Sequence, residues 1–129
     1  MSHWTVCKLK IRNPDRGVLK RVMEVLAKEL GVGVVEENFV VTGWRSKRRC
    51  LFAIPMKLRY GNGYGVYIDS EGYLRVVVDD HGAPLDANSF AAKLNQYYTA
   101  LALATAAQQL GFQVNVNQVE QGVIIDLVR

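Results

Sequence analysis

The stretch from Gly43 to Cys50, GWRSKRRC, gathers four of the chain's sixteen basic residues beside one of its two tryptophans. Cations next to an aromatic ring are typical of surfaces that hold single-stranded nucleic acid, because the cations neutralise phosphates and the ring stacks on bases. The same composition is ordinary for a solvated turn between two strands. The stretch therefore leaves two alternatives, an anion-binding loop and a plain hairpin tip.

Residues that commonly bind metals or act as nucleophiles are few and badly spaced. The imidazole and thiol groups are those of His3, Cys7, Cys50 and His81, and no pair has the CxxC or HxxxH spacing of a zinc site. Both cysteines follow the apolar alternation of their strands, which favours buried, unreactive thiols on the core side, with a disulfide as the alternative. An enzyme or cation site at Asp79–His81 is a minor alternative. We therefore expect no catalytic residue, no metal and no cofactor.

The charges divide unevenly along the chain. Residues 1–59 carry thirteen Lys and Arg against five Asp and Glu, whereas residues 60–129 carry three against seven. Such asymmetry indicates an acidic partner, or self-association between unlike surfaces. The alternative is that the two halves interleave in the fold and neutralise each other.

The length of 129 residues and the hydrophobic share of 50% favour one domain, residues 1–129, with a proper core. No apolar run approaches the ~20 residues that a membrane helix needs. The first residues lack the basic and apolar regions of a signal peptide, so we expect a cytoplasmic protein that does not enter membranes.

Hydrophobic periodicity and turn residues predict the order β-α-β-β-β-β-β-α-β-β, an α+β fold with both helices on one face of an antiparallel sheet. Asn13 and Asp86 are the expected helix caps, and Gly31 and Gly111 the expected stops. A helix end, Leu-Gly and a hairpin occur twice, which leaves a weak internal duplication as an alternative. The predicted strands are residues 4–12, 32–36, 39–44, 48–58, 64–69, 73–79, 112–118 and 122–128.

Strand alternation places basic and aromatic side chains on the sheet face that the helices leave open. Together with the hairpin tip they form the predicted anion or nucleic-acid surface, for which a solvated outer face is the alternative. Its members are Lys8, Lys10, Arg12, Trp44, Arg45, Lys47, Arg48, Arg49, Lys57, Arg59, Tyr67, Tyr73 and Arg75.

The second helix raises a separate expectation, because no charged residue occurs between Leu94 and Val119. A helix with one wet side normally carries charges there. We therefore expect a second covered face, formed by a partner or another copy of the chain, with a merely neutral alanine-rich face as the alternative. The predicted oligomer interface consists of Tyr97, Leu101, Ala104 and Gln108.

Short motifs spread along the chain carry a family resemblance. They are Met1–Trp4, Gly43–Arg45, Asn62–Tyr64, Asn95–Tyr98 and Gln109–Phe112. In this order they resemble a family of unknown function that includes a conserved chloroplast and cyanobacterial reading frame, the thirty-fifth of the hypothetical plastid set. The family tends to carry tryptophan after the fourth or fifth strand, where this chain has Asp79-Asp80-His81.

The resemblance implies no activity, because the family has none assigned. Its association with neighbouring ATPases of the AAA type would suit an adaptor. From the residues and the resemblance together we expect a small, self-associating, non-catalytic binding or adaptor protein. The alternative is a domain that binds single-stranded nucleic acid.

Overall fold

A computed structural model describes residues 3–119 and 122–128, and the α+β class is confirmed. Five antiparallel strands form one sheet in the order β1-β5-β4-β3-β2, and two more form a separate hairpin. The elements in chain order are β1 (Trp4–Arg12), α1 (Arg16–Glu29), β2 (Glu36–Thr42), β3 (Lys47–Pro55), β4 (Gly63–Ile68), β5 (Tyr73–Asp79), α2 (Ala87–Gln109), β6 (Gln113–Val119) and β7 (Gly122–Val128).

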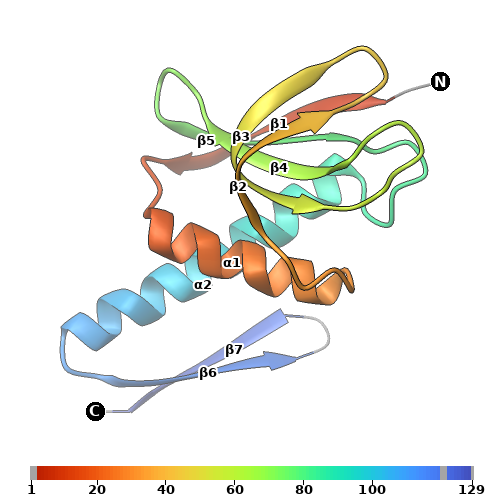
Figure 1. Cartoon of the computed structure of the whole chain (residues 1–129). Helices are drawn as coiled ribbons and strands as arrows, with labels where there is room; N and C mark the ends of the chain where they lie inside the picture. Colours follow the sequence, from red (N-terminus) through yellow and green to blue (C-terminus); the bar gives the residue numbers. More distant parts are fainter. Residues whose placement is uncertain (1–2, 120–121, 129) are drawn as a thin grey trace.

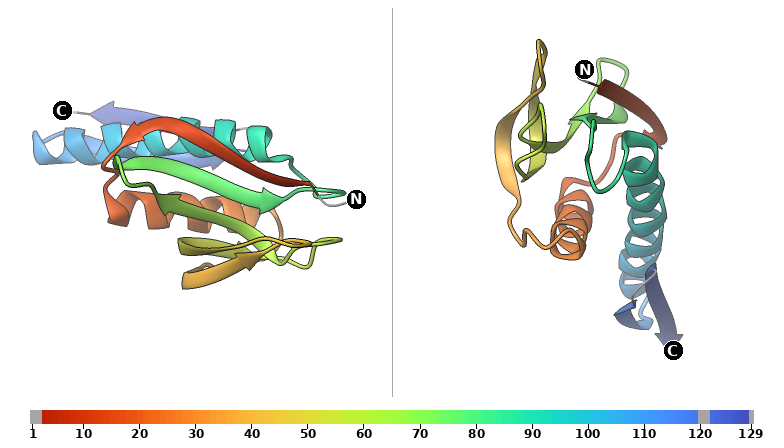
Figure 2. Two further views of the ribbon diagram at one scale, coloured as in Figure 1. Left: turned by 90° about the horizontal axis from the view of Figure 1, so that it is seen from above. Right: turned by 90° about the vertical axis from the view of Figure 1, so that its right-hand side faces the viewer.

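Both helices cover the same face of the five-stranded sheet, as predicted (Figures 1 and 2). The main core lies between these layers, where Phe52 and Val66 of the sheet meet Leu19 and Leu94 of the helices. The β6–β7 hairpin contacts α2 on the side away from the sheet (Figure 1). In the part of the chain described, neither helix has the length and apolar character needed to cross a membrane.

Four strands, rather than the five predicted, lie between the two helices. Residues 32–35 form no ladder, because the N–H groups of Val32 and Gly33 both donate to Ala27 O at the end of α1. The predicted strands 32–36 and 39–44 imply a hairpin turn at Glu37-Asn38, which is also wrong, since both residues lie within β2. The next strand ends at Pro55 instead of residue 58, where proline interrupts the supply of backbone donors.

The helix ends follow local chemistry, with one correction. Asp15, and not Asn13, caps α1, because its Oδ1 accepts from Val18 N–H at 2.9 Å, while Asn13 adopts a positive φ. Asp86 caps α2 as expected and accepts from Ser89 N–H at 2.7 Å. Gly31 and Gly111 follow the helices with φ of 78° and 90°, a conformation that glycine adopts at little cost.

The side chains of β3 switch from one face of the sheet to the other along the strand, which simple alternation did not predict. Phe52 packs in the main core, whereas Cys50 and Ala53, three residues apart, both pack in a second cluster on the outer face, the face turned away from the helices. Asn38 lies opposite this point in the register of β2, between the pairs Glu37–Phe52 and Phe39–Cys50, and its φ is 51°. The left-handed residue kinks the hairpin, so β3 turns about its own axis there.

The bend carries the β2–β3 hairpin back over the outer face, with its tip at the same end of the molecule as the N-terminus (Figure 1). The covered cluster consists of Val41, Cys50, Ala53 and Val77, with Trp4, Phe39 and Tyr67 packed against it. The outer face is therefore partly occupied by the chain itself, and is not the fully open sheet that the sequence predicts.

The two cysteines lie on opposite sides of the sheet. Cys50 is buried in the outer cluster rather than on the core side, so its predicted orientation is wrong. Cys7 is half-buried beside the main core, and its Sγ contacts Asn88 Oδ1 at 3.1 Å. Both thiols are free, and β1 pairs with β5, which excludes the facing arrangement that a disulfide between them requires.

Gly65 provides a test of the folded-over hairpin. A Cβ at this position would lie 2.6 Å from Val41 Cγ2 and closer still to Cys50 Sγ. We expect Gly65→Ala to lower the free energy of unfolding by about 1–3 kcal/mol, because overpacking forces the hairpin away from β4. Chemical denaturation measures the loss, and adding Cys50→Ala should recover part of it. Equal stability of Gly65→Ala and the parent would contradict this packing.

Candidate anion-binding site

Three arginines from two elements line one cavity of 340 Å³, which we call the arginine pocket. Arg16 is the first residue of α1, and Arg48 and Arg49 lie near the start of β3. The bend in β3 brings them together beside the end of β4. The complete lining is Arg16, Asn38, Arg48, Arg49, Cys50, Leu51, Tyr67 and Ile68.

Neighbouring groups restrain two of the guanidinium groups. Arg48 Cζ lies 4.0 Å from the centroid of the Tyr67 ring, a cation–π contact. Arg49 Nη1 donates to the backbone O and to Oδ1 of Asn38, at 3.1 and 3.2 Å. The kinked residue of β2 therefore also positions a cation, and the other nitrogens of Arg49 are left available to an anion.

The pocket lining contains no carboxylate. Among the described residues, none of the three arginines forms an ion pair with an acidic side chain. Arg16 also stands at the positive end of the α1 dipole, where a cation is unfavourable. Three uncompensated cations around one cavity create a strongly positive potential that favours an anionic ligand.

Cys50 contributes a neutral wall to this pocket. Burial raises the pKa of its thiol to about 11, although the nearby Arg48 charge acts in the opposite direction. The group therefore stays protonated at neutral pH, and neither repels an anion nor acts as a nucleophile.

Further basic residues lie near the same end of the sheet. Lys8 Nζ and Arg12 Cζ lie 4.2 and 5.6 Å from the centroid of the Tyr73 ring. Lys8 pairs across the strands with Arg75, which in turn pairs with Tyr67. Arg75 is neutralised by Asp69 at 2.8 Å, and its hydrogen bond lowers the pKa of that carboxyl. Lys8 thus extends the positive charge of the arginine pocket across the outer face.

Trp44 belongs to a second group, the aromatic tip, at the opposite end of β4. Its ring meets Tyr60 edge-on at 5.4 Å, and Tyr60 in turn contacts His81 at 5.4 Å. Arg59 Cζ lies 5.5 Å from the Tyr60 ring centroid. Trp44 is 60% exposed and offers a stacking surface, although loops rather than the sheet position it.

The predicted surface is thus divided into two groups. Arg48, Arg49 and Tyr67 line the arginine pocket, and Lys8, Arg12, Tyr73 and Arg75 lie near the same end of the sheet. Trp44 and Arg59 lie at the tip beside Tyr60, which was not among the predicted residues. Lys10, Arg45, Lys47 and Lys57 are exposed at the surface. Arg16 and Asn38 were missed, because the sequence shows one as an ordinary helix residue and the other as part of a turn.

Three of the four residues of the predicted oligomer interface are buried within the fold of the single chain. Tyr97, Leu101 and Ala104 are 0, 3 and 4% exposed, and Tyr97 Oη donates to Glu29 Oε2 at 2.6 Å. Only Gln108 of the four is exposed. The extra cover that the uncharged helix needs is provided by the chain's own β6–β7 hairpin, which packs on α2.

Asp79 and Asp80, at the end of β5, hold neighbouring segments in place through hydrogen bonds. Asp79, fully buried, accepts from His3 N–H at 2.8 Å and from Trp44 N–H at 3.2 Å. Asp80 accepts from Ala87 N–H at 2.7 Å and contacts His3 Nδ1 at 2.7 Å. The described residues contain no group of three or more metal-binding side chains. These carboxylates attach the N-terminus and the hairpin tip to the sheet.

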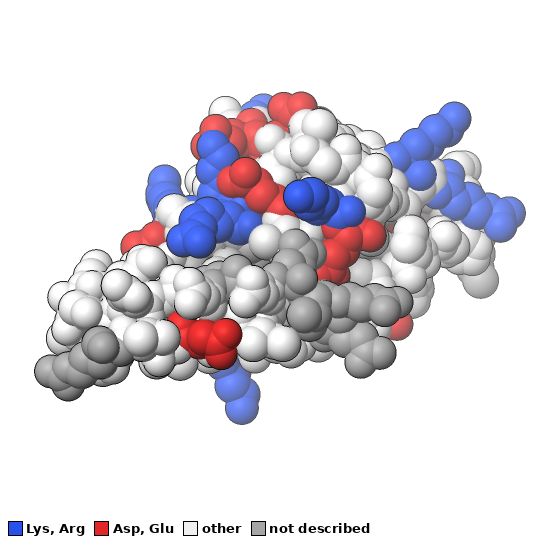
Figure 3. Space-filling model, turned by 90° about the horizontal axis from the view of Figure 1, so that it is seen from below, with Lys and Arg blue, Asp and Glu red and all other residues white. Residues whose placement is uncertain are grey.

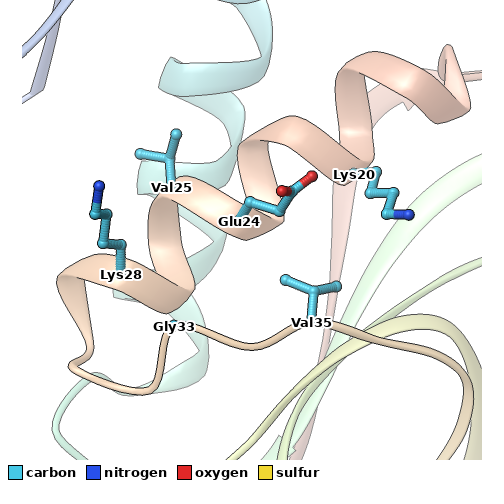
Figure 4. A pocket seen from close by; sticks show the side chains of 6 residues that line it. All are labelled: Lys20, Glu24, Val25, Lys28, Gly33 and Val35. Atoms are coloured by element: carbon cyan, nitrogen blue, oxygen red, sulfur yellow. The ribbon is translucent and has the colours of Figure 1, made fainter.

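A second cavity, of 420 Å³, lies between α1 and the segment that follows it (Figure 4). Lys20 and Lys28 line it together with Glu24, and Lys20 also pairs with Glu37 at 3.4 Å. Its charges are therefore partly compensated, and the arginine pocket is the better anion site.

The fold and the pocket define a small α+β domain with a cationic cavity at one end of its sheet. A family model described as a protein of unknown function, DUF1257, matches residues 26–128. The chain belongs to this family, which agrees with the resemblance seen in its motifs. Neither the curated proteins nor the solved structures contain a significant match.

Asp79 allows a test of how the aromatic tip is held. Asp79→Ala leaves the N–H groups of His3 and Trp44 without their acceptor, so we expect a loss of about 1–3 kcal/mol in the free energy of unfolding. Thermal melting and amide exchange at Trp44 measure the effect. Asp126→Ala, which removes an exposed acid from β7, is the matched control. Equal exchange at Trp44 in both variants would contradict the attachment.

Proposed function

We propose that the protein is a non-catalytic binding module for single-stranded nucleic acid. The observation that carries this proposal is the arginine pocket, in which three guanidinium groups share one cavity without a carboxylate in its lining. Arginine is suited to phosphate because its planar fork of donors matches the phosphate oxygens.

The aromatic residues differ in their expected roles, because some hold a cation and one is free to stack on a base. Tyr67 and Tyr73 each have a cation close to the ring, so they hold Arg48 and Lys8 in place and are poorly placed to stack on bases. Trp44 is the more suitable stacking residue, since most of its surface is exposed. A strand held at the pocket and directed along the outer face would contact phosphates first and a base at the tip.

Salt dependence tests this proposal. Each phosphate contact releases counterions, so affinity for single strands should fall with log salt at a slope of about −0.7 per contact. We expect Arg16→Ala/Arg48→Ala to flatten the slope by about 1.4, because two contacts at ~0.7 each are lost. Fluorescence anisotropy with a labelled oligonucleotide measures the slope.

The matched control is Lys20→Ala/Lys28→Ala, which removes the same charge from the other cavity and should leave the slope nearly unchanged. Circular dichroism checks that both variants fold. Absence of salt-sensitive binding to single-stranded DNA and RNA at low ionic strength would exclude the proposal. Equal changes of slope in the two variants would show that the arginine pocket is not the binding site.

Self-association is a second candidate, supported by apolar side chains at the C-terminal end of the fold. Leu103 of α2 and Leu110, the residue that caps its C-terminal end, are 58 and 75% exposed. Ile124 and Leu127 of β7 are 50 and 45% exposed. On the face seen from below, most of the basic and acidic side chains gather in one part, and the other described surface is largely uncharged but includes an acidic side chain (Figure 3). A homo-oligomeric adaptor would use this area.

Leu110→Glu tests the second candidate. A charge at this exposed apolar position should dissociate an assembly, because a buried carboxylate without a partner is costly. Light scattering at high micromolar concentration should show an oligomer for the parent and a monomer for the variant. Ala92→Glu, at an exposed position near the start of α2, is the control for general charge effects. A monomeric parent would exclude self-association.

The narrower expectations remain proposals that rest on short motifs and composition. They are the relation to the plastid and cyanobacterial reading frame, an AAA-type ATPase as partner, and a cytoplasmic location. The AAA-type partner belongs with the adaptor candidate, in which the uncharged end of α2 would be the contact.

A further inference from the structure

We propose that the arginine pocket binds a terminal phosphate monoester, so that the protein recognises a phosphorylated end of a nucleic-acid strand. This inference rests on the proposed function and specifies which part of the strand enters the pocket. It follows from the charge of the pocket, the residues that line it, and the way its donors are held.

The charge of the pocket exceeds what one backbone phosphate can neutralise. Arg16, Arg48 and Arg49 bring three positive charges to a lining without a carboxylate. A phosphodiester inside a strand carries one negative charge, whereas a phosphate monoester carries about −1.5 to −2 at pH 7. The monoester therefore compensates the three guanidinium groups more fully.

The lining places the three guanidinium groups around one open cavity, where a terminal phosphate can contact all of them. The walls around the 340 Å³ cavity come from α1, β2, β3 and β4, with Ile68 and Leu51 adding apolar surface between the polar groups.

The donors are held before a ligand arrives. Tyr67 supports the Arg48 guanidinium at 4.0 Å, and Asn38 holds Arg49 through Nη1. A fixed fork loses less conformational freedom on binding than a mobile side chain. Cys50, protonated because burial raises its pKa to about 11, adds no negative charge beside the phosphate.

The experiment compares three forms of one short oligodeoxythymidine, with a 5′-phosphate, a 3′-phosphate, or hydroxyl groups at both ends. Each carries the same internal fluorescent label, and anisotropy gives the dissociation constant. We expect one phosphorylated form to bind about tenfold more tightly than the hydroxyl form, as charge-assisted hydrogen bonds imply. The phosphorylated arm that binds more tightly identifies the end recognised.

The preference should disappear in Arg48→Ala and persist in Lys28→Ala. Arg48→Lys, which keeps the charge but loses the planar fork, should retain only part of it. The preference should also weaken below about pH 6, where the monoester gains a proton. Circular dichroism establishes that each variant is folded, and Arg16→Ala provides a second variant outside the bent strand.

The outcomes separate this inference from the proposed function. Equal, salt-sensitive binding of all three oligonucleotides overturns the end-recognition inference and leaves nucleic-acid binding intact. Failure of every oligonucleotide to bind overturns both. If a phosphoserine peptide then binds through Arg48 and its unphosphorylated form does not, the pocket belongs to a phosphoprotein reader, and the nucleic-acid assignment is wrong.

Discussion

The bend of β3 opposite Asn38 determines how the outer face is packed and where the candidate site forms. It lets one continuous strand supply Phe52 to the main core and Cys50 to the cluster on the outer face. It folds the β2–β3 hairpin over the sheet, where Gly65 leaves space for Cys50 and Val41. The same bend places Arg48 over Tyr67 and forms a concave surface from an otherwise open sheet. Fold and candidate site therefore have one local origin, a left-handed residue in an edge strand.

The two ends of the sheet have different roles. At one end, Asp79 and Asp80 use buried carboxylates to attach the N-terminus, the hairpin tip and α2. Their carboxylate oxygens accept hydrogen bonds from backbone N–H groups and so hold these segments against the sheet. At the other end, Arg16, Arg48 and Arg49 have no such compensation within the described chain. All three are exposed, so water solvates them, and their grouping around one cavity indicates an anionic ligand more specifically than the total charge of +4 does.

Local signals in the sequence were sufficient to predict most of the helices and strands. They were insufficient to predict how these elements pack against one another. Asp86, Gly31 and Gly111 act through their nearest neighbours, so the helix ends could be predicted, and alternation placed Lys8, Tyr67 and Arg75 on the outer face. Cys50 was misplaced because alternation assumes that the strand keeps one orientation. Asparagine adopts the left-handed conformation more readily than most residues, but the sequence indicated a turn at Asn38 rather than a kink within a strand. Tyr97 and Leu101 were assigned to an interface although they belong to the main core, because which face of α2 packs against α1 and the sheet is decided by tertiary contacts. The grouping of Arg16 with Arg48 likewise depends on long-range packing.

The central claim is that the three arginines of the pocket act together as one anion site. Nuclear magnetic resonance of the arginine side-chain Nε–H groups, recorded while inorganic phosphate is added at constant ionic strength, tests it most directly. We expect saturable shifts at Arg16, Arg48 and Arg49 with a common dissociation constant, and little change at Arg45 and Arg59 of the opposite end. Small, unsaturable shifts of similar size at all arginines would contradict it.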